Sequence, residues 1–291
     1  MQSPAPTRPR PVLLLILCLL TASLWATSLH ASAISAAPLA ETIRREGLAS
    51  RLLIRSEEQG DTARGSVDAM VDYPFAVLST ALTGIDPWCE ITFLHFNIKA
   101  CVYREDDSGG HVTLYSGRMH YQPPEKSFRN DYLFREEART DTRFAVSMLG
   151  ADGPFGTRDY EIRIEAVPLD AQRSLLRLSY SVSYGLITRT AQRLYFATAG
   201  RHRIGFSTED GKPIRGLRGM MERNTMRFYL ALQAYLESPA DDALETRLAR
   251  WHALTLKYPD QLKELPLEEY LDNKMRERAH QQALQQQPDS D

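Results

Sequence analysis

A polar residue inside an apolar helix face is the clearest candidate for chemistry in this sequence. Apolar residues spaced three and four apart predict a long helix over residues 216–237. The stripe that they form consists of Leu217, Met221, Phe228, Ala231, Leu232 and Tyr235. Asn224 falls within it, and a buried amide without a hydrogen-bond partner costs about 1 to 3 kcal/mol. An apolar helix face with one amide is typical of a helix that forms one wall of a ligand cavity.

Two arginines border this stripe and suggest a second kind of chemistry. Arg227 is placed to reach an anionic headgroup or a carboxylate, and Arg223 lies one turn before it. The alternative is a surface ion pair that contributes well under about 1 kcal/mol. Glu222 is expected to point away from the stripe.

The helix must be positioned by the strands that precede it. Residues 160–166 and 176–184 alternate apolar with polar side chains, as half-buried strands do. The connection at residues 168–173 is short and predicts an antiparallel pair. Further strands are expected at residues 64–73, 96–102, 111–121, 131–137, 143–149 and 202–207. Short helices are expected at residues 39–46, 75–82 and near Trp88, and a helix at 186–198, for which a strand is the alternative.

The N-terminus reads as an export signal. Arg8 and Arg10 precede an apolar run over residues 12–26 and then small residues, which predicts cleavage after Ala33 and a periplasmic or secreted protein. The alternative is an anchor in the inner membrane formed by residues 12–33, although the run is shorter than the roughly 20 residues that span a bilayer. Cleavage removes two of the 35 basic residues and none of the 37 acidic ones, so the net charge changes from -2 to -4. This charge excludes the global basic field that is typical of nucleic-acid binding.

Two of the three cysteines remain after that cleavage. Export to an oxidising compartment would allow Cys89 and Cys101 to form a disulfide, and two buried thiols are the alternative. The histidines and cysteines have no metal-ligand spacing, and the sequence carries no Gly-x-Ser-x-Gly elbow. No metal, cofactor or catalytic residue is therefore expected.

The expected domain organisation follows from these elements. Residues 34–61 form a leader segment, residues 62–237 form the main domain, and residues 238–280 form a helical extension. The tail at residues 281–291 is rich in glutamine and is expected to be disordered.

The order of the elements resembles a known superfamily. A strand at residues 64–73, short helices at 74–88, strands from 96 to 207 and a long helix at 216–237 are similar in layout to START-like, Bet v 1-like proteins, also called SRPBCC or helix-grip proteins. This resemblance covers roughly residues 62–237 and includes no catalytic motif. It implies an α+β fold in which a curved antiparallel sheet grips the long helix.

The resemblance also implies a cavity between the sheet and the long helix. The positions that would line it are Tyr160, Ile162, Leu178, Tyr180, Val182, Tyr184, Met221, Asn224, Arg227 and Phe228. A solid core is the alternative. The function expected from such a cavity is binding or carriage of a hydrophobic or amphipathic small molecule such as a lipid. Two other hypotheses are a protein-interaction or membrane-surface module that presents Trp251, Leu254 and Tyr258, and a cyclase-like enzyme, which rests on fold analogy alone.

Overall fold

The computed structural model describes residues 34–107, 109–198, 200–238 and 244–287. The expected signal segment, residues 1–33, lies outside the described residues. The described part is α+β, as the sequence predicts.

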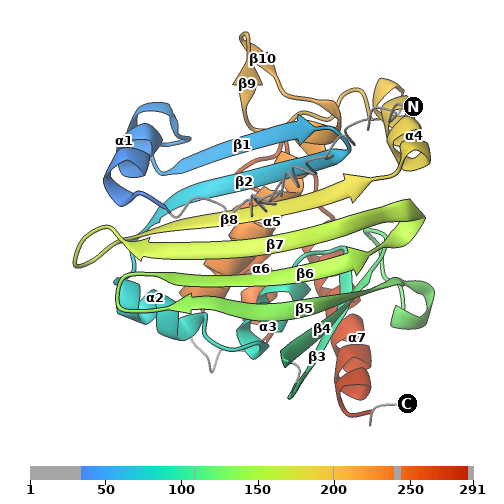
Figure 1. Cartoon of the computed structure of the whole chain (residues 1–291). Coiled ribbons are helices and arrows are strands. Elements are labelled where there is room, and N and C mark those ends of the chain that lie inside the picture. Colours follow the sequence, from blue (N-terminus) through green and yellow to red (C-terminus); the bar gives the residue numbers. More distant parts are fainter. Residues whose placement is uncertain (1–33, 108, 199, 239–243, 288–291) are drawn as a thin grey trace, which may run out of the picture. The chain divides into compact units, whose positions relative to one another are not determined.

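Eight strands form one antiparallel sheet in the order β1-β2-β8-β7-β6-β5-β4-β3 (Figure 1). The strands are β1 (Leu52–Gln59), β2 (Thr62–Val71), β3 (Ile98–Asp106), β4 (Gly109–Ser116), β5 (Phe128–Arg139), β6 (Phe144–Asp152), β7 (Thr157–Pro168) and β8 (Ser174–Tyr184). The predicted pair is confirmed, because Ile162 of β7 lies opposite Tyr180 of β8. Register shifts interrupt the β3–β4, β5–β6 and β7–β8 ladders, and such bulges bend a sheet.

Helix α5 (Gly216–Glu237) has the predicted bounds and packs against β2, β1 and β8 on one face of the sheet (Figure 1). Its close approach to β2 requires a glycine. A Cβ at Gly65 would lie 2.5 Å from Thr225 Oγ1 and 2.9 Å from the carbonyl oxygen of Met221. Gly65 therefore lets α5 lie directly on the strand.

Six further helices surround this unit: α1 (Ala36–Glu46), α2 (Phe75–Ala81), α3 (Asp86–Phe93), α4 (Leu186–Ala197), α6 (Leu244–Thr255) and α7 (Leu267–Gln285). These include the helix expected at 186–198. Helix α1 covers part of the sheet in a separate apolar cluster, where Ala40 and Ile43 pack with Leu53, Met70 and Leu175.

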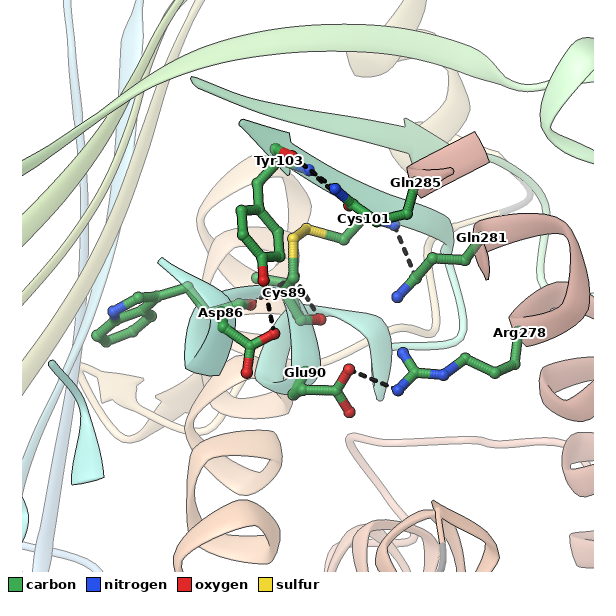
Figure 2. Close-up of a disulfide and its surroundings, with 10 residues drawn as sticks. Asp86, Cys89, Glu90, Cys101, Tyr103, Arg278, Gln281 and Gln285 are labelled. Atoms are coloured by element: carbon green, nitrogen blue, oxygen red, sulfur yellow. Dashed lines mark hydrogen bonds and ion pairs between the residues drawn. A yellow bond between two sulfur atoms is a disulfide. The ribbon is translucent and has the colours of Figure 1, made fainter. Parts of the chain in front are cut away.

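A disulfide fastens α3 to the sheet edge. The structure joins Cys89 of α3 to Cys101 of β3, with 5.2 Å between their Cα atoms (Figure 2). Tyr103, two residues beyond Cys101, donates its hydroxyl hydrogen to Asp86 of the same helix at 3.0 Å. Both cysteines are buried, so the crosslink belongs to the core.

Helix α7 covers the backbone of edge strand β3 (Figure 2). The side-chain oxygen of Gln281 accepts the backbone N–H of Cys101 at 2.9 Å. The Gln285 amide both accepts the N–H of Tyr103 at 3.0 Å and donates to its carbonyl at 2.7 Å. An uncovered strand edge is a template for pairing with another chain, and these glutamines occupy part of that template.

Two lysines share one glutamate between α7 and β3. Lys99 Nζ lies 2.9 Å from Glu277 Oε1, and Lys274 Nζ lies 2.9 Å from Glu277 Oε2. The side chains of Lys99 and Glu277 are 0% exposed, and that of Lys274 is 1% exposed. Lys99 is fully buried in spite of its charge. Its burial is explained by this ion pair and by the carbonyls of Phe96 and His120, which also accept from Nζ.

Elements and contacts of the described residues cross the expected domain boundaries in three places. Strand β1 pairs with β2 along its whole length, so the sheet begins within the expected leader at residues 34–61. Trp251 and Leu254 of α6, in the expected extension, are buried in the main core. Helix α7 continues to Gln285, so residues 281–285 are helical rather than disordered. Strand β1 is joined to β2 by a two-residue turn, whereas the core partners of α6 and the β3 partner of α7 are remote in sequence and cannot be seen in a local pattern.

The strand expected at residues 202–207 is absent from the sheet. The backbone N–H groups of Phe206 and Ser207 instead donate to Glu222 of α5, at 2.6 and 3.0 Å. A two-residue hairpin follows, formed by β9 (Thr208–Glu209) and β10 (Lys212–Pro213). The alternating pattern at 202–207 therefore reflects a segment held against a helix.

Candidate functional site

A row of rings runs across the sheet face that α5 covers. Centroids are 6.1 Å apart for Tyr132 and Tyr160, 6.4 Å for Tyr160 and Tyr180, and 6.3 Å for Tyr180 and Phe228. The row then reaches His95, whose ring centroid is 4.8 Å from that of Phe228. Strands β5, β7 and β8 and helix α5 thus each supply one ring to a continuous aromatic surface.

The structure brings together most of the side chains predicted to line this space. Ile162, Leu178 and Phe228 are buried in the main core. Val182, Tyr184 and Met221 are buried in an adjoining cluster that also contains Ala63. The tyrosine hydroxyl of Tyr184 donates to Met221 Sδ at 3.8 Å, which ties β8 to α5. At these positions the sheet and helix are in direct contact.

Tyr160 and Tyr180 differ from these packed neighbours because both are only half-buried. Burial nevertheless raises the pKa of Tyr180 well above its usual value, and the pKa of Tyr160 is also raised, chiefly by burial. A side chain surrounded by protein that keeps accessible surface is typical of a recess lining. The Tyr160 hydroxyl is 2.7 Å from Thr157 Oγ1, whereas that of Tyr180 has no partner among the residues that the structure describes.

Asn224 lies one turn after Met221 and one turn before Phe228. Met221 packs with Val182 and Tyr184 of β8, and the ring of Phe228 lies beside that of Tyr180. Its side chain is half-buried and makes no hydrogen bond within the described ranges. The cost of an unsatisfied buried amide is avoided at Asn224, because this side chain keeps accessible surface. Asn224 and Tyr180 thus each carry a polar group without a hydrogen-bond partner among the described residues.

Arg227 does not lie at the rim of this space, contrary to expectation. Its Nε is 2.7 Å from Glu264 Oε1, and its guanidinium carbon lies 4.9 Å from the centroid of Phe96. Both charged groups of the pair are buried. Arg227 is therefore held by a core ion pair, since Glu264 reaches it from the segment between α6 and α7.

Glu222 was expected to point away from the core and is in fact fully buried, with 0% exposure. Besides the N–H groups of Phe206 and Ser207, it accepts from the hydroxyls of Ser56 and Ser207. The carboxylate thus joins β1, α5 and the segment after α4. No local signal indicated this role, because α5 is buried on nearly all sides rather than along one stripe.

His95 is a second functional candidate that the sequence did not identify. Burial lowers the pKa of its imidazole well below the usual value, so the ring is neutral. Its Nδ1 accepts the backbone N–H of Asn97 at 3.1 Å, which places the hydrogen on Nε2. That Nε2 is buried and has no acceptor in the described part of the chain. The end of the aromatic row therefore carries an unmet donor.

Open grooves also occur on the described part of the chain. A groove of about 800 Å³ is lined by residues of β3 to β6 and the end of α7, and includes Tyr132, the first ring of the row. Another of about 380 Å³ lies between α4 and the start of α5, lined in part by Phe196, Arg215 and Leu217.

Within the described ranges, no three His, Cys, Asp or Glu side chains are grouped as a metal site. None of the described helices is long and apolar enough to cross a membrane.

Comparison with known proteins gave matches only among solved structures. No family model and no curated protein sequence matches the chain. A START superfamily protein from Mycobacterium smegmatis is 16% identical, with coverage of 47% of this chain and 95% of that one and a TM-score of 0.31. The Zhui aromatase/cyclase from Streptomyces sp. R1128 is 15% identical, with coverage of 60% and 92% and a TM-score of 0.37. Norcoclaurine synthase from Thalictrum flavum is 11% identical, with coverage of 49% and 85% and a TM-score of 0.32.

Identities this low concern the fold alone, and TM-scores this low add nothing to what the architecture itself shows. The architecture is an eight-stranded curved antiparallel sheet with a 22-residue helix laid across one face. It is the arrangement that the sequence predicted from its order of elements. The chain has the helix-grip arrangement of a curved antiparallel sheet and one long helix.

Proposed function

We propose that the protein binds a hydrophobic or amphipathic small molecule, such as a lipid, between the sheet and α5. The observation that carries this proposal is Tyr180, which lies between sheet and helix yet keeps accessible ring surface and a hydroxyl with no partner among the described residues. Tyr160 and Asn224 share this partial exposure.

Apolar burial would supply most of the affinity. Each Å² of apolar surface removed from water contributes about 25 cal/mol, so about 200 Å² of an acyl chain contributes about 5 kcal/mol. One hydrogen bond contributes only about 0.5 to 1.5 kcal/mol net. The Tyr180 hydroxyl and the Asn224 amide would therefore select among ligands that the aromatic row already holds.

Export is part of the same proposal. The N-terminal pattern of residues 1–33 supports it, and so does the Cys89–Cys101 disulfide, because such crosslinks persist in oxidising compartments. We propose a periplasmic or secreted carrier. Sequencing the N-terminus of protein recovered from the exported fraction tests this, and a chain that still begins at Met1 in the membrane fraction would instead support the anchor.

Native mass spectrometry of the purified protein, followed by organic extraction, tests ligand binding. We expect a reproducible bound mass between roughly 200 and 900 Da, a range that suits cavities of this class. A protein that is empty after purification and takes up no fluorescent fatty acid contradicts the proposal.

Two variants connect the ligand to the site. Asn224→Leu should remain folded and carry a different set of ligands, because only the polar selection is lost. Tyr180→Phe should weaken binding of hydroxyl- or carbonyl-bearing ligands severalfold, consistent with one lost hydrogen bond. Tyr115→Phe on β4 is the matched control, since Tyr115 is also half-buried but lies outside the aromatic row. Identical ligand content in all three proteins would assign the ligand to another site.

A further inference from the structure

The segment that follows α4 gathers positive charge against α5. Arg201 and Arg203 are exposed, Arg215 donates to the carbonyl of Arg201 at 2.5 Å, and Arg223 of α5 donates to the carbonyl of Ile204 at 2.8 Å. None of these four arginines forms an ion pair with a carboxylate in the described ranges, whereas Arg218 pairs with Glu209. These four guanidinium groups therefore have no direct ion pair with an acid among the described residues.

Arg223 is the member that most needs an explanation. Its side chain is as buried as that of Arg227, both residues being 3% exposed. Arg227 has Glu264 as its partner, but Arg223 has one backbone carbonyl and no acid. Glu222 is the carboxylate that acts on Arg223, and it is already engaged by Ser56, Phe206 and Ser207.

The guanidinium of Arg223 remains both charged and reachable. Burial, followed by the nearby charges of Arg227 and Arg203, lowers the pKa of Arg223 to about 10, so the group is still protonated at neutral pH. Only Nη1 has an acceptor among the described residues. Nε and Nη2 of Arg223 are not fully buried, whereas Nη2 of Arg227 is fully buried and has no hydrogen-bond partner among the described residues. Arg223 thus has N–H groups that keep some accessible surface and have no acceptor among the described residues.

A buried charge without a counter-ion is destabilising, and proteins pair such charges or neutralise them. Arginine is suited to oxyanions because its planar group can donate two parallel hydrogen bonds to carboxylate or phosphate. We propose that Arg223 and Arg203 form a phosphate-binding site between α5 and the segment after α4. The phosphate is either a free ion or the headgroup of an amphiphile.

The test is calorimetric titration of the full chain in a phosphate-free buffer of low ionic strength. Inorganic phosphate, octyl phosphate and octanol are the three probes. We expect wild-type protein to bind both phosphates, Arg223→Gln to bind them at least tenfold more weakly, and Arg203→Gln at least threefold more weakly. Arg44→Gln is the matched control, because Arg44 is exposed on α1, has no acid partner there and removes the same charge. Its affinity for phosphate should equal that of wild type.

Absence of phosphate and octyl phosphate binding by wild type overturns the proposal, and so does unchanged affinity in folded Arg223→Gln protein. If that variant does not fold, Arg203→Gln decides, since its side chain is exposed and its removal leaves the core intact. Tighter binding of octyl phosphate than of inorganic phosphate identifies a headgroup site, and equal binding identifies a free-ion site. The anion site stands independently of the proposed apolar cavity: octanol reports on the cavity, and inorganic phosphate reports on Arg223.

Discussion

Removing the carboxylate that Lys99 and Lys274 share should strongly destabilise the protein. Glu277 is the acid in contact with both ammonium groups, at 2.9 Å from each, and all three side chains are sealed from water. Glu277→Gln keeps the shape but leaves two buried cations without a counter-charge. Breaking a buried ion pair in this way costs about 3 to 5 kcal/mol, which is a large part of the roughly 5 to 15 kcal/mol that stabilises a domain.

Urea unfolding followed by tryptophan fluorescence measures this loss, since Trp251 lies in the same core. Glu269→Gln on the same helix is the control. Glu269 contacts the exposed His120 at 2.7 Å, so its substitution should change the free energy of unfolding by less than about 1 kcal/mol. Adding Lys274→Met to Glu277→Gln should recover part of the loss, because Lys99 keeps two carbonyl acceptors. A Glu277→Gln protein as stable as the control would refute the reasoning.

Three further predictions concern the same core. Replacing Cys89 and Cys101 by Ala should lower the free energy of unfolding by about 3 kcal/mol in urea titrations, because the crosslink closes a loop of 12 residues in the unfolded chain; an unchanged midpoint contradicts this. Burial lowers the pKa of Lys274 from 10.5 to about 8, so between these pH values the unfolded chain binds more protons and stability should rise with pH from about 8. Burial lowers the pKa of Lys99 as well, so Lys274→Met should reduce that rise without abolishing it, and an identical pH profile in the variant excludes Lys274 as a source. Glu222→Gln should destabilise the protein by about 1 to 3 kcal/mol. It should also speed hydrogen exchange at the backbone N–H groups of Phe206 and Ser207, because their hydrogen bonds to the side chain of residue 222 become weaker. Exchange at Gly65, outside that contact, serves as the reference.

The sequence predicted the fold because its main signals are local. The bounds of α5 follow from apolar spacing alone, and the β7–β8 pair follows from alternation around a short connection. The order of these elements was sufficient to indicate the helix-grip arrangement. Residues 202–207 show the limit of such local signals. Their alternation predicted a strand, but the backbone N–H of Phe206 donates to the carboxylate of Glu222 on α5 instead of to another strand.

The candidate site was predicted only in part. Strand alternation placed Tyr160, Tyr180 and their neighbours on the face toward α5, and the structure brings them together with Phe228. Alternation does not reveal which of them keep accessible surface. His95 was missed, because a single histidine among apolar residues has no local mark that distinguishes a packed ring from one with an unmet donor.

Residue type and spacing thus determined most of the elements and their order, and the apolar faces of α5, β7 and β8. The tertiary structure alone decided which charges are paired. Arg223 and Arg227 are one turn apart and equivalent in sequence, yet the chain brings Glu264 to Arg227, 37 residues away, and brings only the carbonyl of Ile204 to Arg223. The buried carboxylate of Glu222 likewise accepts a hydrogen bond from the hydroxyl of Ser56, which is 166 residues away in the sequence. The energy of a charge inside a protein depends on atoms within a few ångströms of it, and folding gathers those atoms from remote parts of the chain.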